Sequence, residues 1–341
     1  MRTRVILLSV GIWLSGMVSA TAWSRAGHEL VARIAWNRLD EQGKGCLYTV
    51  LRHHPAFREW QHEAEAAASA GAAMPADPRL FIVQRAAAWP DDIRRRGADN
   101  PFRLEDPSKV HGDWHYVDHP LTFDGTRCPT TLPQDNVLKG LRWANGVLST
   151  PTADIRERAI ALAWLLHLVG DIHQPLHCAE RYSQALPKGD RGGNEWQVRL
   201  PDGRELNLHW MWDSLADQVG DASTKECAVR KLDEEKGPDV RFEQWSLEGA
   251  QIARVHVYEK GAVPGAPIKD SHAPPRNVPA LTQDYLDGSL DIARHRLWLA
   301  GGRLGDILCA YWPPNETSSP LLRAGSQVAP DKRSRPGSTR R

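Results

Sequence analysis

The chain has 341 residues, 41% of them hydrophobic, and a formal net charge of +1. That length is enough to bury a large core in one domain or two. The small net charge excludes a protein that captures polyanions through a uniformly basic surface. After residue 22, no segment approaches the length that a transmembrane helix needs.

Residues 1–22 have the three parts of a signal peptide. Arg2 and Arg4 form a charged start, residues 5–18 are mostly apolar, and Ala20-Thr21-Ala22 matches the small-x-small cleavage rule. We therefore expect an exported protein, secreted or periplasmic, that has no membrane segment after cleavage and begins at Trp23. A retained membrane anchor is the alternative interpretation of the same residues.

Cleavage would change the charge distribution. Loss of Arg2 and Arg4 gives a net charge of −1, and residues 321–341 carry a net +5, so residues 23–320 carry −6. A site for anions on this acidic body would need another source of positive charge. Bound cations could supply it.

The periodicity along the chain is mainly helical. Apolar residues recur at helical spacing in 27–39, 134–149 and 153–170, and 280–311 predicts one or two further helices. Alternating residues on either side of Pro201-Asp202-Gly203 predict a small β-hairpin. We expect one mainly α domain.

Two stretches are expected to lie outside this fold. Residues 61–78 are Ala-rich and predict an inserted helix or loop. Residues 313–341 are rich in Pro, Ser, Gly and Arg, and are expected to be a disordered basic tail because they hold few apolar residues. The folded domain is therefore predicted to span 23–312.

The chain has five cysteines, and an exported protein with five can form at most two disulfide bonds. Their spacing fits no zinc finger or redox motif and leaves the pairing open. The cysteines are Cys46, Cys128, Cys178, Cys227 and Cys309.

The segment HLVGDIHQPLH, residues 167–177, is the densest group of chemically active side chains. His167 and Asp171 are four residues apart in a helical segment, so both project from one face. Pro175 then ends the helix and allows His177 to turn back toward them. His209 and Asp213 repeat the four-residue spacing, and imidazole with carboxylate is a ligand set that zinc accepts.

Two further segments contain candidate ligands. In AAAWPDDIRRR, Asp91 precedes Arg94, and in DWHYVDHP, His115 precedes Tyr116 and Asp118. Taken separately, Asp91 could cap a helix and His115 could be an ordinary buried ring. His173 is expected to pack behind the ligands.

The order of these motifs resembles that of the S1/P1 nuclease family. It runs Trp-x-x-x-x-His, Trp-x-Asp, Trp-His-Tyr-x-Asp, His-x-x-x-Asp-x-His-Gln-Pro-Leu-His, Gly-Gly-Asn and Asn-Leu-His-x-x-x-Asp, and covers most of 23–312. The resemblance implies a single-domain helical bundle of the S1/P1 nuclease and zinc phospholipase C type. It also implies three Zn²⁺ ions and hydrolysis of single-stranded DNA and RNA to 5′-nucleotides, often with 3′-nucleotidase activity.

The resemblance also implies a role for each matching position. Trp23 would bind zinc through its free α-amino nitrogen and its carbonyl oxygen, beside His28, and Asp171 would bridge that ion to a second. The remaining implied ligands are Asp91, His115 and His167 for the second ion, and His177, His209 and Asp213 for the third.

The same resemblance suggests catalytic and substrate-binding residues. Asp91 would orient or deprotonate the attacking water, and Arg94 would neutralise charge on the phosphate. Tyr116 would stack on an unpaired base, Asp118 would accept from its edge, and Asn194 would make a polar contact.

Two positions depart from the family pattern, and other functions compete. Pro90 stands where the family usually has Ala, and the Ser expected after Glu248 is missing. A zinc phospholipase C would use a similar three-metal site, and a non-catalytic zinc-binding protein would need no base pocket. The nucleotide-type motifs favour a nuclease, which we expect to act as a monomer.

Overall fold

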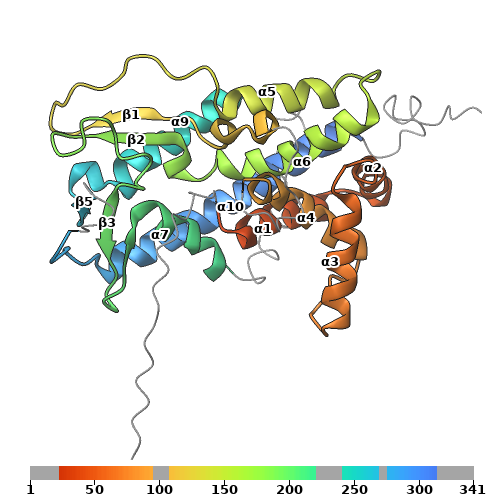
Figure 1. Cartoon of the computed structure of the whole chain (residues 1–341), viewed down its shortest axis with the longest axis horizontal. Helices are drawn as coiled ribbons and strands as arrows, with labels where there is room; N and C mark the ends of the chain where they lie inside the picture. Colours follow the sequence, from red (N-terminus) through yellow and green to blue (C-terminus); the bar gives the residue numbers. More distant parts are fainter. Residues whose placement is uncertain (1–22, 95–106, 220–239, 269–274, 313–341) are drawn as a thin grey trace, which may run out of the picture.

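A computed structural model describes residues 23–94, 107–219, 240–268 and 275–312. The described chain is mainly helical, which confirms the predicted fold class (Figure 1). In chain order its α-helices are α1 (Arg25–Arg38), α2 (Glu41–Leu51), α3 (Phe57–Ser69), α4 (Pro78–Asp92), α5 (Val137–Leu148), α6 (Ile155–Asp171), α7 (Leu208–Ser214), α9 (Phe242–Ile252) and α10 (Gln283–Tyr311).

Helix α6 forms the centre of the bundle. It packs against α4, α5 and α10, and its residues from Arg158 to Asp171 are buried apart from Ile160. A helix that is apolar on nearly every side is stable only where other helices surround it. Asp154 caps its start by accepting from the backbone N–H groups of Arg156 and Glu157, which would otherwise lack partners.

Helices α1 and α10 pack closely against each other and complete this core. A Cβ atom added at Gly301 of α10 would lie 2.5 Å from Cβ of Ile34 in α1. Glycine at this position therefore sets how near the two helices can come. Predicted helix 280–311 is one continuous helix of 29 residues rather than two.

Two small sheets lie at one end of the bundle (Figure 1). The predicted hairpin is confirmed as β3 (Trp196–Arg199) paired antiparallel with β4 (Glu205–Asn207), and β5 (Ala266–Pro267) adds an unpredicted third strand. The second sheet, which we did not predict, pairs β1 (His119–Thr122) in parallel with β2 (Ala179–Tyr182). These strands are too short to show a clear alternating pattern.

Short helical turns complete the described fold. They are the 3₁₀ turns η1 (Pro107–Val110), η2 (Gly112–His115), η3 (Pro175–Cys178), η4 (Leu215–Gln218) and η6 (Glu259–Gly261), and the π-helical turn η5 (Ala253–Val257).

Helix α3 extends away from the body of the bundle (Figure 1). It begins at Phe57 and contains the first half of the predicted insertion 61–78, while its buried residues Phe57 and Trp60 lie near its start. The part rich in alanine is largely exposed. Its status as an insertion remains a prediction.

Several predictions fall outside the described residues, namely the signal peptide, the basic tail 313–341 and Cys227. Cys46, Cys128, Cys178 and Cys309 are described and all four are free thiols, so the expected disulfide bond is not found among them. Within the ranges that the structure describes, no helix is long and apolar enough to cross a membrane.

Candidate metal centre

The end of α6 places His167 and Asp171 together in the core, as their spacing predicted. Both are fully buried, and Nε2 of His167 lies 3.1 Å from Oδ2 of Asp171. Nδ1 of His167 is 2.8 Å from the carbonyl of Ala87 in α4. A carbonyl only accepts, so Nδ1 carries the proton and the Nε2 lone pair faces the carboxylate.

Asp171 connects two sides of this cluster. Its Oδ1 is 3.4 Å from Nε2 of His28 in α1, and its Oδ2 is 3.1 Å from Nδ1 of His115 in η2. The His28 ring stacks on His167 at 3.9 Å between centroids. Asp91, at the end of α4, lies 3.7 Å from His115. Five predicted ligands, which come from four elements, thus meet around one carboxylate.

The remaining three predicted side-chain ligands form a second group. Nδ1 of His177 donates to the His115 carbonyl at 2.7 Å, and Nδ1 of His209 donates to the Gly192 carbonyl at 2.7 Å. The Nε2 atoms of these two histidines face each other at 3.1 Å. Oδ2 of Asp213 lies 3.4 Å from Nε2 of His209. Gln174 Nε2 donates to the other oxygen of Asp213 at 2.7 Å.

This geometry fits a cation better than a proton. The two facing Nε2 atoms both present lone pairs, and two lone pairs at 3.1 Å repel unless a proton or a cation lies between them. Burial, and then the neighbouring His209, holds the pKa of His177 well below its usual range. A proton is therefore disfavoured, and a metal ion would satisfy both nitrogens.

The carboxylates in the cluster also favour a cation. Burial raises the pKa of Asp171 to about 6 and raises the pKa of Asp213 well above its usual range, so isolated negative charge is costly here. Burial also opposes a charged His167, but the carboxylates of Asp171 and Asp91 outweigh it and raise the pKa of that ring. The cluster therefore stabilises positive charge.

Several buried polar atoms of the first cluster make no hydrogen bond within the described part of the chain. They are both ring nitrogens of His28, Nε2 of His115, and one carboxylate oxygen each of Asp91 and Asp171. Leaving such atoms without partners costs free energy. Three sets of side chains, of which the first two share His167, have ligand atoms within 4.8 Å of one another: His28, Asp91 and His167; His115, His167 and Asp171; and His177, His209 and Asp213. Imidazole nitrogen with carboxylate oxygen suits zinc.

The chain at Trp23 and Ser24 contacts both groups of candidate ligands. Trp23 is 0% exposed, and its Nε1 donates to the carbonyl of Gly170, next to Asp171, at 3.1 Å. The backbone N–H of Ser24 donates to the carbonyl of Asp213 at 3.2 Å. The chain at residues 23 and 24 therefore runs between the ends of α6 and α7.

The predicted catalytic and substrate residues surround the ligands to different degrees. Nη1 of Arg94 is 3.6 Å from Oδ1 of Asp91. The half-buried Tyr116 follows His115 and donates to Oδ1 of Asp113 at 2.9 Å. Burial, and then the carboxylates of Glu180 and Asp190, raises the pKa of Asp118 to about 7.

The side chain of Asn194 bonds within its own loop. Its Nδ2 donates to the carbonyl of Arg191 at 2.8 Å, so this amide closes its own loop. The two glycines before Asn194 allow the loop backbone to pack closely against the rest of the protein. Gly192 has a φ of +61°, and a Cβ there would lie 2.6 Å from the Leu176 carbonyl. The loop thus holds His209 through the Gly192 carbonyl.

Sequence reasoning did not identify two residues that hold this arrangement. Gln174 holds Asp213, as described above. Asp190 is buried and accepts from the Arg181 backbone at 3.0 Å and from the Tyr258 hydroxyl at 2.8 Å, which anchors the Gly192 loop. Neither has a periodic signal, and only their position inside the motifs HQPLH and GDRGGN could have drawn attention to them.

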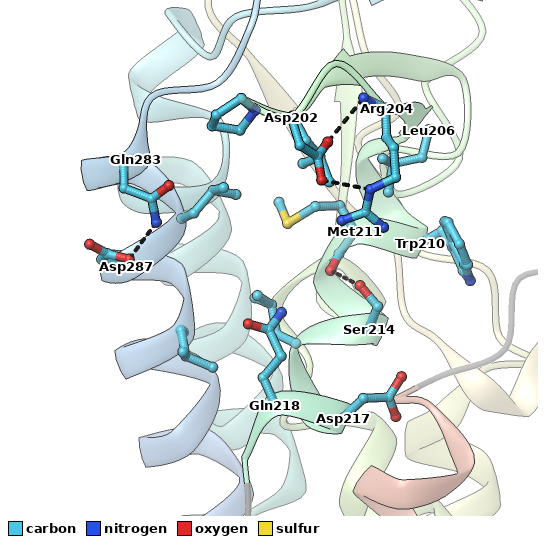
Figure 2. Close-up of a pocket in the computed structure, with 15 residues that line it drawn as sticks. Asp202, Arg204, Leu206, Trp210, Met211, Ser214, Asp217, Gln218, Gln283 and Asp287 are labelled. Carbon is cyan, nitrogen blue, oxygen red and sulfur yellow. Dashed lines mark hydrogen bonds and ion pairs between the residues drawn. The ribbon is translucent and has the colours of Figure 1, made fainter.

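A pocket of about 490 Å³ lies on the other face of α7 (Figure 2). Trp210, Met211 and Ser214 line it, and none of the predicted metal ligands does. The hairpin contributes Asp202 and Arg204, which pair at 2.8 Å. The pocket is therefore separate from the metal centre.

Comparison with known proteins gives matches over the same region. The S1/P1 Nuclease family model matches residues 23–312. Endonuclease 2 of Arabidopsis thaliana is 22% identical over 313 residues, which cover 89% of this chain and 96% of that protein. Endonuclease 4 of the same plant is 29% identical over 208 residues (58% and 56%), and Nuclease S1 of Aspergillus oryzae is 24% identical over 195 residues (56% and 53%).

Proposed function

Because this chain belongs to the S1/P1 nuclease family, we propose that it is an exported, monomeric, zinc-dependent phosphodiesterase that hydrolyses single-stranded DNA and RNA to 5′-nucleotides. Family membership and the nuclease relatives make it a hydrolase of nucleic-acid ester bonds. The observation that carries the finer proposal is the pair of buried Nε2 atoms of His177 and His209, which face each other at 3.1 Å beside Asp213.

We assign three Zn²⁺ ions to the ligands that meet in the core. Asp171 would bridge two of them, which is supported by its two oxygens facing different histidines. Bound zinc supplies Lewis-acid polarisation of phosphate oxygens and lowers the pKa of water. The proposed sets are Trp23, His28 and Asp171; Asp91, His115, His167 and Asp171; and His177, His209 and Asp213.

Asp91 and Arg94 would act on the reacting groups. Oδ1 of Asp91 is buried and makes no hydrogen bond among the described residues, so it can accept a proton from the attacking water. Nη1 of Arg94, 3.6 Å from that oxygen, is placed to donate to a phosphate oxygen as negative charge develops. Asp91 lies in the last turn of α4, and Arg94 lies in the turn directly after it.

Tyr116, Asp118 and Asn194 would bind the base and its surroundings. An aromatic ring next to a ligand residue can stack on a base, and stacking requires that base to be unpaired. Asp118, three residues from His115, can accept from a base edge. Asn194 would contribute its side-chain oxygen, because its Nδ2 is bonded to Arg191.

We include 3′-nucleotidase activity in the proposal. A terminal 3′-phosphate presents the same ester oxygen to the same groups. The phospholipase alternative has no comparable support, since the relatives described above are nucleases.

The test is mass spectrometry of products from single-stranded DNA, single-stranded RNA, duplex DNA and phosphatidylcholine, each incubated with the protein that begins at Trp23. We expect nucleotides with 5′-phosphates from both single strands, much less from the duplex, and no phosphocholine. Products that end in 3′-phosphates, or release of phosphocholine alone, would contradict the proposal. Light scattering of the same sample should give the mass of a monomer.

A further inference from the structure

A group of charged side chains lies behind the proposed metal ligands, with one member buried (Arg296) and two partly exposed (Glu248 and Arg303). Arg296 and Arg303 of α10 both bond to the single carboxylate of Glu248 in α9. Nη1 of Arg296 donates to Oε2 at 3.1 Å, and Arg303 donates to Oε2 and Oε1 at 2.8 and 2.9 Å. We call these three residues the clamp triad.

The clamp triad bonds to both the backbone and the side chain of His173. Nε of Arg296 donates to the His173 carbonyl at 3.0 Å, and Nη1 of Arg303 donates to its ring Nε2 at 2.9 Å. The other ring nitrogen, Nδ1, donates to the carbonyl of Val169 in α6 at 2.7 Å. Backbone and side chain of His173 are therefore fixed at once.

His173 lies in the turn that joins the two ligand groups. This turn begins directly after Asp171, which belongs to the first group, and ends at His177, which belongs to the second. Between them, Gln174 donates to Asp213 at 2.7 Å. A shift of this turn would move ligands of both groups relative to each other.

The charges of the clamp triad are not explained by folding alone. Arg296 is 2% exposed, and burial lowers its pKa, so its charge is costly. Apolar side chains of similar size often stabilise a fold as well as a buried ion pair does. Two guanidinium groups on one carboxylate instead give a fixed direction to the hydrogen bonds at His173.

We propose that Arg296, Glu248 and Arg303 are positioning residues that set the separation of the two zinc-ligand groups through His173. This inference rests on the proposed zinc-dependent function. The triad touches neither ligand nor substrate, and acts only through the turn from Asp171 to His177.

The first test replaces Arg303 with Met and measures zinc affinity by competition with a chromophoric chelator, and unfolding by urea with and without zinc. We expect zinc to bind about 10–100-fold more weakly, as is typical when residues that orient ligands are lost. The increase in stability on adding zinc should shrink, and kcat should fall more than KM changes. Arg303→Lys, which retains a charged donor, should restore part of each.

A triple variant separates positioning from folding. Arg296→Met, Glu248→Leu and Arg303→Met together remove all three charges and keep apolar volume, so the metal-free fold should retain most of its stability. Its zinc affinity should still fall. Arg38→Met is the matched control, because Arg38 pairs with Asp306 and likewise ties α10 to a neighbouring helix, α1. It should lower stability equally with and without zinc.

Unchanged zinc affinity in both clamp variants, with an equal loss of stability in the metal-free and zinc-loaded states, would overturn the inference and leave the proposed function intact. A wild-type protein that binds no zinc would overturn the proposed function and this inference with it.

Discussion

Asp171 is the residue whose contacts reach furthest across the metal centre. Its two oxygens face His28 on one side and His115 and His167 on the other. Asp213 faces a single ligand group, with His209, His177 and Gln174 around its carboxylate among the described residues. We predict that Asp171→Asn lowers kcat/KM at least about tenfold more than Asp213→Asn, because it weakens two ligand sets instead of one. Steady-state kinetics on single-stranded DNA, with the zinc content measured, gives the comparison.

Equal losses at equal zinc content would mean that Asp171 does not bridge. Because both variants keep the size of the side chain, a difference in packing would not explain a difference in rate.

Tyr116 provides a test of base stacking. Tyr116→Ala should weaken cleavage of single-stranded DNA by about 1–3 kcal/mol in transition-state stabilisation, and should affect a small phosphodiester without a base much less. Tyr116→Phe is the control, since it keeps the ring and loses only the hydroxyl bond to Asp113. The measurement is kcat/KM on both substrates.

If Tyr116→Ala lowered kcat/KM equally for both substrates, the ring would support His115 structurally rather than bind the base. If Tyr116→Phe matched Tyr116→Ala, the hydroxyl bond rather than the stacking ring would be responsible.

His54 should contribute to acid sensitivity without taking part in the site. Its ring lies between Trp60 and Trp89, its Nδ1 accepts from the Ala56 backbone at 3.0 Å, and burial lowers its pKa from 6.5 to about 3. Below pH 6.5, His54 therefore binds a proton in the unfolded chain but stays neutral in the folded chain. Stability should be complete above pH 6.5 and should fall as the pH decreases toward 3.

The measurement is urea unfolding of wild type and His54→Asn at pH 7.5, 6 and 5, because the Asn oxygen can still accept from Ala56. The wild type should lose up to about 1.4 kcal/mol per pH unit below pH 6.5 relative to the variant. Parallel pH curves would place a titrating, solvated ring at this position.

At the scale of elements, the start of α1 decides whether the chain end is a ligand. Trp23 is buried against Gly170, and Ser24 bonds to Asp213, so the α-amino group of a chain that begins at Trp23 would lie between the ligand groups. Such an amine has a pKa of about 7.7–8.0, low enough for zinc to displace its proton. One extra Met before Trp23 should therefore lower the zinc content and abolish most of the activity.

Three proteins give the comparison, one that begins at Trp23, one with the added Met, and one with a removable N-terminal tag. Removal of the tag should restore zinc and turnover. Equal zinc content and turnover in the Met-extended protein would show that the chain end is not a ligand.

The sequence predicted some elements better than others. Periodicity located α5, α6 and α10 because each is long enough to repeat its apolar pattern. It missed the parallel pair β1 and β2, whose four-residue strands pair across about 60 residues of sequence. Such pairing depends on which distant segment packs beside each strand, and a local sequence pattern contains no information about that segment.

For the whole molecule, metal removal should affect stability and activity together. The proposed side-chain ligands come from α1, α4, η2, α6, η3 and α7, so bound zinc would connect most of the bundle. About three ions per chain are expected by elemental analysis. Each site would add about 4 kcal/mol to the free energy of unfolding when free zinc is 1,000 times its Kd.

Thermal unfolding before and after EDTA, followed by zinc addition, is the measurement. The melting temperature and hydrolysis should fall together and return together. Full hydrolysis by a protein shown to be free of metal would exclude the metal-dependent mechanism.

The sequence by itself determined which side chains are candidate ligands and how several of them pair along a helix. His167 with Asp171, and His209 with Asp213, share a helix face because four residues make about one turn. Cleavage and destination remain predictions, since residues 1–22 lie outside the described structure.

Only the tertiary structure decided how these pairs meet and which way their nitrogens point. Carbonyl groups of Ala87, His115 and Gly192 hold the Nδ1 atoms of three histidines, and all three carbonyls belong to segments distant in sequence. The clamp triad is likewise invisible in any local pattern, because Glu248 and Arg303 are 55 residues apart. Spacing along a helix places side chains on one face of that helix. A metal site needs ligand atoms from several helices to point at one position, and only the packing of those helices brings them together.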